Sequence, residues 1–352
     1  MITILATIII LGTLILVHEL GHFVAAKLCG VRVEKFSLGF PPTLLSKKFG
    51  ETEYGIGAIP FGGYIRMTGD GSNGEVGEPQ IGDLHSKSRC ARAFIVSAGS
   101  LMNLLLAVVI FWVIIAFHGL GEVSKSAVIG GVVMDSPADS AGLVTGDSII
   151  AINNETIAGW DEMASMVHPR TGLNTEFRVA RDDSIFIIAI TPGGHVVAAA
   201  DGEKEIGLIG IQPSVFYKPA GVLKAVPGAF ALFGEIFLSI GDFIEKIIDS
   251  GIQRGDIGGP VLIAKMAGVS ARAGWAAFLF FMAALSINLG ILNMLPFPVL
   301  DGGHLVYLGI EAIRRKPLSL KAKLVAQQIG VLILLALMFY VTVNDIFFVL
   351  GG

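Results

Sequence analysis

The sequence contains little cysteine and little charge. Of its 352 residues only 2 are cysteines and only 15% are charged, whereas 53% are hydrophobic. Two cysteines cannot build a disulfide framework, and they cannot form a zinc site from thiolates alone. The 25 Lys and Arg residues form no dominant basic stripe, so no nucleic-acid partner is expected. Because a soluble chain carries about a quarter charged residues, the deficit indicates a membrane protein.

The apolar residues gather in four segments that are long enough to cross a lipid bilayer. We place these spans at about 1–28, 94–117, 276–297 and 325–350. Another apolar stretch, 228–248, contains interspersed glycines and acids, and a helix on the membrane surface fits it better than a fifth crossing. The first span lacks a basic start and a small-residue cleavage site, so we expect it to be retained rather than removed as a signal peptide.

The distribution of Lys and Arg predicts the orientation of the spans. Basic residues gather between the first two spans, for example at Lys47, Lys48 and Arg92, and again before the last span at Arg314 and Arg315. The positive-inside rule places both of these loops in the cytoplasm. Both termini and the region after the second span then lie on the outer side of the membrane.

Three ionisable side chains, His18, Glu19 and His22, lie inside the first apolar span. On a helix the two histidines are one turn apart on the same face, so both imidazoles can reach one cation, with Glu19 beside them. This H-E-x-x-H spacing is typical of zinc peptidases. The same five-residue pattern also occurs by chance in soluble helices. Inside a membrane span each charged residue costs roughly 2.5–3.5 kcal/mol, which favours a metal site over a chance match.

A catalytic zinc ion needs three protein ligands and an open position, so a third ligand must come from elsewhere in the chain. The segment 288–304 carries two amides, two prolines and an aspartate within an apolar stretch. Pro296 and Pro298 are expected to end the helix, which leaves Asp301 at the cytoplasmic end, at the depth of the two histidines. From spacing alone, Asp301 can equally be an interfacial cap, and His304 is a weaker candidate ligand.

Two regions outside the spans predict β structure. Residues 53–67 are rich in glycine and contain Pro60, so we expect a short β-hairpin or re-entrant loop packed against the first span, with a cytoplasmic surface turn as the alternative. The composition becomes that of a soluble domain after residue 120. Strands are predicted there at 127–133, 147–152, 174–180, 185–190 and 206–211, and a helix at 160–168.

These predictions define a polytopic α-helical membrane protein with about four transmembrane helices, a membrane-associated β-hairpin and an inserted α+β domain. We divide the chain into four parts. They are an N-terminal membrane half (1–120), the inserted domain (121–215), an amphipathic or membrane-surface helical linker (216–275) and a C-terminal membrane half (276–352).

The motifs in the membrane segments resemble those of the site-2 protease family of intramembrane zinc metalloproteases. The resemblance rests on the H-E-x-x-H pattern at 18–22 together with the segment 288–303, which contains the triplet Leu300, Asp301 and Gly302. The glycine-rich segment 55–67 and Gly99 with Asn103 extend the similarity.

The inserted domain resembles the permuted PDZ domains of bacterial proteases. The similarity lies in the segment 136–143, in the turn at Gly146 and in Asp147, which opens the next strand. Such domains take a peptide as an added strand, and the resemblance suggests 207–211 as the strand edge. With a PDZ domain inserted between its membrane halves, the chain resembles the RseP-type (regulator of sigma-E protease) members. It departs from the best-known of these in having one PDZ domain, where they carry two in tandem.

The resemblance implies one zinc ion and a role for six residues. These are His18, His22 and Asp301 as zinc ligands, Glu19 as general base, and Asn288 and Asn293 as side chains that hold the substrate backbone. The segment 55–67 offers a strand edge on which an unwound substrate could pair.

The resemblance also implies an endopeptidase of the bacterial inner membrane, with a periplasmic PDZ domain and an active site near the cytoplasmic side. Its activity would be regulated intramembrane proteolysis after a first cleavage outside the membrane. Expected partners are single-span membrane proteins, such as anti-sigma factors or signal-peptide remnants, a peptide or substrate segment bound by the PDZ domain, and the lipid bilayer.

Two other classes of protein are weighed against this one. A catalytically inert scaffold would be expected to have lost His18, Glu19, His22 or Asp301, and all four are present. A metal transporter usually needs polar residues along a whole path and often has internal repeats. Here the polar residues cluster at one depth, and no repeat is found, so both alternatives are disfavoured.

Overall fold

The computed structural model describes residues 1–69, 82–199, 202–251, 258–316 and 318–350. The chain forms two compact units, one made of Met1–Phe117 with Gly221–Gly352 and the other of His118–Ala220. The first unit is mainly helical, and the second is rich in β-strands. The prediction of a multi-span helical membrane protein with an inserted β-rich domain is confirmed. The finer division into four parts stays a prediction.

Five helices among the described residues are long and apolar enough to cross a membrane. Four of them follow the predicted spans: α1 (Ile2–Leu28), α2 (Arg89–Phe117), α7 (Trp275–Met294) and α9 (Leu320–Leu350). Large apolar side chains such as Leu5, Leu332 and Phe339 are exposed on these helices, as expected for side chains that face lipid.

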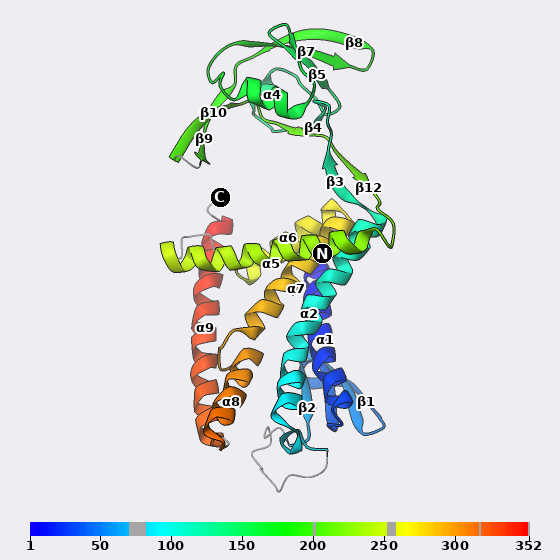
Figure 1. Ribbon diagram of the computed structural model, residues 1–352, viewed down its shortest axis with the longest axis vertical. Helices are drawn as coiled ribbons and strands as arrows, with labels where there is room; N and C mark the ends of the chain where they lie inside the picture. Colours follow the sequence, from blue (N-terminus) through cyan, green and yellow to red (C-terminus); the bar gives the residue numbers. More distant parts are fainter. Residues whose placement is uncertain (70–81, 200–201, 252–257, 317, 351–352) are drawn as a thin grey trace. The chain divides into compact units, whose positions relative to one another are not determined.

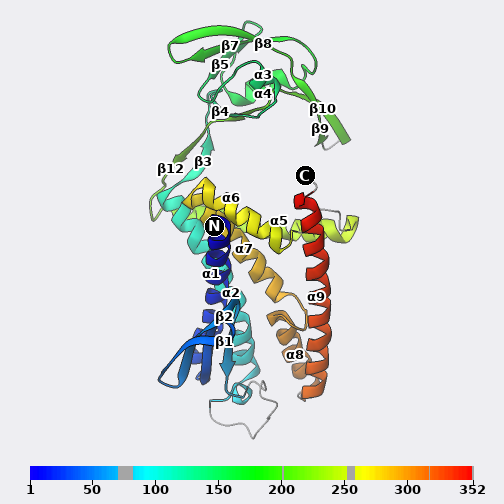
Figure 2. The same cartoon turned by 180° about the vertical axis from the view of Figure 1, so that it is seen from behind.

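The fifth candidate, Ala225–Phe243, belongs to α5 (Ala225–Ser250). In both views α5 crosses the long axes of α2 and α9 at a steep angle, at the end of the unit where α1 begins (Figure 1 and Figure 2). This direction favours the predicted helix on the membrane surface over a fifth crossing. Helix α6 (Pro260–Ala273) follows α5 and packs against α1.

Glycines let α2 approach α1 on one side and α7 on the other. A Cβ atom on Gly21 of α1 would lie 2.3 Å from the Ala98 carbonyl oxygen, and one on Gly290 of α7 would lie 3.1 Å from the Ser100 carbonyl oxygen. Small residues allow this close packing of helices in membranes. Helix α2 therefore lies between the two helices that lead to the predicted metal ligands.

The first loop forms a sheet from β1 (Val33–Phe49) and β2 (Thr52–Met67), followed by the short helix η1 (Leu84–Ser86). Both strands double back. Ser37 pairs with Tyr64 on one side and with Gly55 on the other, and Gly55 also pairs with Ser46. Across the sheet, the order of neighbouring segments is therefore 45–48, 53–56, 35–38 and 63–66. The two arms of 53–67 do not pair with each other as a hairpin of that segment would, because 35–38 lies between them.

A break of six residues separates α7 from α8 (Asp301–Arg314). Leu295 is extended, with φ −63° and ψ 146°, as expected for the residue before a proline. Cβ atoms on Gly302 and Gly303 would each lie 2.1 Å from a carbonyl oxygen of the break, that of Leu295 and that of Phe297. The two glycines therefore let the chain fold back tightly, and Asp301 becomes the first residue of α8.

The far end of α8 is held by an ion-pair cluster. The carboxylate of Glu311, which is 3% exposed, lies 2.8 Å from Lys323 Nζ of α9 and 3.5 Å from Arg92 Nη1 of α2. On α9, the buried carboxylate of Asp345 accepts hydrogen bonds from the backbone of Gly259 and Leu262 at the start of α6, both at 3.0 Å. These contacts fix the C-terminal helices against the rest of the unit.

The second unit has short strands around two helices. Its elements are β3 (Leu120–Val123), β4 (Ile129–Val132), α3 (Pro137–Ser140), β5 (Ser148–Ile152), β6 (Glu155–Thr156), α4 (Trp160–Val167), β7 (Thr175–Arg181), β8 (Ser184–Ile190), β9 (Gly193–Ala199), β10 (Gly202–Leu208), β11 (Ile211–Pro213) and β12 (Val215–Lys218). The strands β6-β5-β7-β8 form one sheet, and β9 with β10, β4 with β11 and β3 with β12 form pairs. Buried Phe177, Ile149 and Met163 lie in its core.

Four predicted strands and the predicted helix correspond to β4, β5, β7, β8 and α4. The strand predicted at 206–211 is instead divided between β10 and β11. Gly210 has φ +82°, and a Cβ atom there would lie 2.2 Å from Ser136 Cβ, so the chain turns at this glycine. Within 207–211, the suggested peptide edge, Gly207 already pairs with β9 and Ile211 with β4.

A buried ion pair stabilises this second unit. Asp147, which is fully buried, accepts hydrogen bonds from Arg181 Nε at 2.6 Å and Nη2 at 2.8 Å, and from the Val144 backbone at 2.9 Å. The hydrogen bonds from Arg181 hold the pKa of the Asp147 carboxyl below its ordinary value.

Replacing Arg181 with Met is expected to destabilise the second unit by about 2–3 kcal/mol, because a buried carboxylate loses its partner. The loss is smaller than for a fully buried pair, since Arg181 is 38% exposed. Because the pKa of the Asp147 carboxyl is lower in the folded than in the unfolded state, the ion pair stabilises the unit above about pH 4. This stabilisation is lost as the pH falls through the folded-state pKa. The measurement is the urea concentration at which half of this unit becomes susceptible to proteolysis. At pH 7 this midpoint should be lower for Arg181→Met than for the parent, and the two midpoints should converge in acid. Arg178→Met, on the same strand, should change little.

Candidate metal centre

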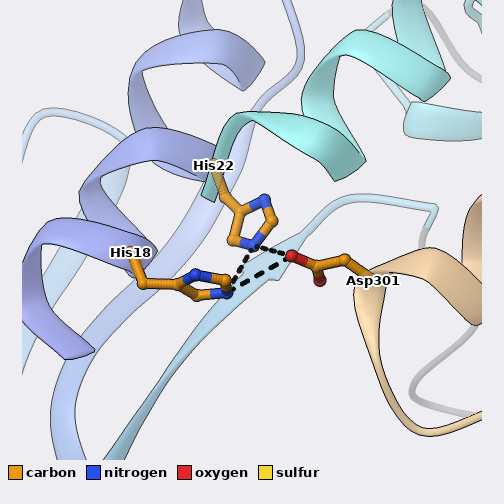
Figure 3. A group of neighbouring side chains, drawn as sticks. All are labelled: His18, His22 and Asp301. Atoms are coloured by element: carbon orange, nitrogen blue, oxygen red, sulfur yellow. Dashed lines mark hydrogen bonds and ion pairs between the residues drawn. The ribbon is translucent and has the colours of Figure 1, made fainter. Parts of the chain in front are cut away.

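Two helices bring three metal-binding side chains together. His18 and His22 come from α1 and Asp301 from the start of α8, and their ligand atoms point toward one another (Figure 3). His18 Nε2 lies 3.1 Å from His22 Nε2, and Asp301 Oδ2 lies 3.4 Å and 3.5 Å from these two nitrogens. All three side chains are largely buried, with exposures of 12%, 10% and 17%. The expected convergence of Asp301 with the two histidines is thus observed.

The spacing of these three atoms fits a zinc ion. Ligands at about 2.0–2.1 Å from a tetrahedral zinc are about 3.3 Å from each other, and the three separations here are 3.1–3.5 Å. Two imidazoles and one carboxylate are also a donor set that catalytic zinc sites use. Within the described part of the chain, no other group of three or more His, Cys, Asp or Glu side chains converges in this way.

Neighbouring groups on α2 hold two of the three side chains. His22 Nδ1 lies 2.8 Å from the Ile95 carbonyl oxygen, which can accept only from a protonated Nδ1. That tautomer leaves the lone pair of His22 Nε2 free for a metal. Ser100 Oγ donates a hydrogen bond of 3.1 Å to Asp301 Oδ2. Neither Ile95 nor Ser100 is predicted from the sequence, because a backbone carbonyl and a lone serine give no sequence signal.

Gly99 leaves the space in which the two imidazoles lie. A Cβ atom at Gly99 would lie 2.4 Å from His22 Nε2 and 2.8 Å from His18 Nε2. Cβ atoms do not approach other heavy atoms this closely. The absence of a side chain at this position of α2 is therefore a requirement of the metal centre.

A cavity of about 320 Å³ adjoins the cluster. Glu19 and Asn293 line it beside His18, His22 and Asp301, as does the segment 63–65 of β2. A Cβ atom on Gly63 would lie 3.0 Å from Glu19 Cγ, so the strand passes directly against this side chain. The cavity therefore brings a carboxylate, an amide and a strand next to the candidate metal ligands.

Two other residues from the sequence analysis lie outside this group. Asn288 is exposed on α7 and does not line the cavity, in contrast to Asn293. His304 is exposed on α8, where its ring contacts that of Tyr307 at a centroid distance of 5.9 Å. The substrate-binding role of Asn288 stays a prediction, and His304 is not part of the metal cluster.

A buried two-histidine, one-carboxylate cluster beside a glutamate, in a protein of several apolar helices, defines the class of membrane-bound zinc metalloproteases. Comparison with known proteins identifies the family. Residues 6–337 match the model of Peptidase family M50, and the chain belongs to that family. It is accordingly a zinc metalloprotease, as the sequence predicts.

Relatives of similar length support this assignment. A protein of Clostridium acetobutylicum is 33% identical over 97% of both chains, and one of Mesorhizobium japonicum is 32% identical over 98% of both. One of Rickettsia conorii is 34% identical over 98% of this chain and 99% of its own. All three are described as candidate zinc metalloproteases.

Among solved structures, the PDZ domain of the SdrC-like protein of Listeria monocytogenes matches 27% of this chain and 93% of its own length. The two are 19% identical, with a TM-score of 0.21, which is too low to bear on function.

Replacing Gly99 with Ala is expected to abolish zinc binding, because the added methyl group overlaps both imidazoles. The measurement is the zinc content of the purified protein by mass spectrometry. Gly12→Ala on α1 is the matched control, since nothing lies within 4 Å of a Cβ atom there. Equal zinc content in the two variants would contradict the role assigned to Gly99.

Proposed function

We propose that this protein is an intramembrane endopeptidase of the site-2 protease type that cleaves single-span membrane proteins. His18, His22 and Asp301 would hold the zinc ion, and Glu19 would act as general base. The observation that carries the proposal is that Glu19 and the three-residue cluster line one cavity and that both His18 and His22 belong to an apolar span. His22 precedes the end of α1 by about 9 Å, which supports a reaction inside the membrane boundary.

The reaction is the hydrolysis of a peptide bond. A bound zinc ion supplies Lewis-acid polarisation of the scissile carbonyl and lowers the pKa of water. The Glu19 carboxylate takes a proton from the attacking water and delivers it to the leaving amine. The Asn293 amide, on the same cavity, is placed to hydrogen-bond the substrate backbone or the developing oxyanion.

The substrate enters this site as an extended strand, because a helix hides its peptide bonds behind side chains. The segment 63–66 of β2 supports this view, since it is an edge of the four-segment sheet and 63–65 line the cavity. An edge strand can add a peptide through backbone hydrogen bonds. Gly57, by contrast, pairs with Thr43 within the sheet, so the edge for substrate is narrower than the predicted 55–67.

The orientation of the protein follows from its basic loops. The sheet of β1 and β2 and helix α8 lie at the end of the first unit opposite to α5 (Figure 1). Lys47, Lys48 and Arg314 belong to these elements, which supports a cytoplasmic position for this end. The active site then lies near the cytoplasmic side of a bacterial inner membrane, with both termini and the inserted PDZ-like unit in the periplasm.

In this setting the activity is regulated intramembrane proteolysis of the RseP type. A first protease trims the substrate outside the membrane, and the remaining single-span fragment is then cut. Anti-sigma factors and signal-peptide remnants are the substrate classes of this kind. The inserted unit would bind a peptide or a substrate segment by strand addition.

Glu19→Gln is expected to lower cleavage of a model single-span substrate by at least about 10²-fold while zinc content stays at the parental level. Glutamine keeps the size of the side chain but cannot accept the proton. The measurement pairs a gel assay of cleavage with zinc analysis of the same preparation. As a control, His22→Ala is expected to lose both cleavage and zinc. Cleavage by Glu19→Gln at the parental rate would refute the general-base role.

Cysteine cross-linking tests the position of the substrate. In a Glu19→Gln chain without Cys29 and Cys90, Tyr64→Cys should form a disulfide with a cysteine near the scissile bond of a trapped substrate. Ser46→Cys is the matched control, because it lies on the opposite edge segment of the same sheet. The measurement is the yield of cross-linked product on a gel, which should be higher for Tyr64→Cys than for Ser46→Cys. Equal yields would contradict binding of the substrate along 63–66.

A further inference from the structure

The second nitrogen of the His18 ring faces α2. His18 Nε2 belongs to the metal cluster, while His18 Nδ1 lies 3.4 Å from the side-chain nitrogen Nδ2 of Asn103. Asn103 is fully buried, with an exposed fraction of 0%. Its side-chain oxygen Oδ1 is also buried and has no hydrogen-bond partner among the described residues. Within the described part of the chain, the only side-chain partner of this amide is the His18 ring, so the state of that ring determines how the amide is oriented.

The tautomer of His18 decides which atom of the Asn103 amide faces the ring. A neutral imidazole carries one hydrogen, and a metal needs the lone pair of Nε2, so the hydrogen must be on Nδ1. A protonated Nδ1 requires an acceptor, and an Nδ2 amide group is a donor only. Oxygen and nitrogen of an amide are similar in size, so half a turn about the last side-chain bond exchanges them within the same space. Asn103 Oδ1 then accepts from His18 Nδ1.

We propose that Asn103 is a positioning residue that accepts a hydrogen bond from His18 Nδ1 and thereby fixes the zinc-binding tautomer of His18. It does for His18 what the Ile95 carbonyl oxygen does for His22, at 2.8 Å from His22 Nδ1. Both acceptors belong to α2 and lie two turns apart. One helix that contributes no residue to the cluster would therefore set the tautomer of both histidines of α1.

The placement of Asn103 is secured independently of its side chain. Ser286 Oγ of α7 donates a hydrogen bond of 2.7 Å to the backbone oxygen of Asn103. This bond joins α2 to α7 whatever side chain stands at position 103. The contribution of the amide to zinc binding can therefore be separated from the packing of the two helices.

The proposal rests on the proposed zinc ligands, and zinc affinity of the full-length protein in detergent tests it. Asn103→Leu keeps the volume but has no acceptor, and the zinc dissociation constant should rise by about 10–100-fold. Asn103→Asp keeps an acceptor and should restore most of the affinity. Asn103→Val serves in place of Leu if that chain does not fold. Competition with a chelator of known affinity gives the constants without reference to activity.

Ser286→Ala is the matched control, because it removes the bond between α2 and α7 and leaves the amide in place. Its zinc affinity should equal that of the parent. An unchanged affinity in both Asn103→Leu and Asn103→Val would overturn the proposal, as would an equal loss in Ser286→Ala. If His18→Ala binds zinc as tightly as the parent, the proposed ligand set itself fails, which is a different outcome.

Discussion

The contact between α1 and α2 has no room for a Cβ atom at Gly21 or at Gly99. At Gly21 the two backbones meet, and at Gly99 the imidazoles of α1 occupy the place of a side chain on α2. Helices in a membrane gain little from hydrophobic association and rely on such close packing. Helix α2 also packs on α7 through Gly290, and α7 leads to the break before Asp301. The metal centre therefore depends on the spacing of three helices.

A low-dielectric interior makes every polar group of this site dependent on a partner. Ile95 and Ser100 supply partners for His22 and Asp301 from positions on α2. Gly302 and Gly303, in the first turn of α8, allow this helix to begin against the backbone of Leu295 and Phe297. Irregular backbone at membrane depth is tolerated when it lines a polar cavity, and this segment does so through Val299 and Leu300.

The strand pairing in the β structure is only partly specified by local sequence patterns. Glycine and proline in 53–67 correctly indicated a chain that bends back, but the partner strand 35–38 lies outside that window and contains Lys35. Pairing between distant segments depends on contacts that local composition does not encode. In the second unit the regular strands were predictable from alternation, whereas Gly210 divided an apolar run because of its contact with Ser136.

The sequence by itself determined the membrane class, the approximate spans and the pairing of His18 with His22. These depend on composition and on helical periodicity, which are local properties. Whether Asp301 or another residue completes the cluster was open from the sequence, and only the tertiary structure decided it. Ser100 and Asp301 are 201 residues apart in the chain, yet a hydrogen bond of 3.1 Å joins them. That proximity results from the packing of α2 between α1 and α7, which involves side chains from all three helices at once and cannot be derived from any one of them.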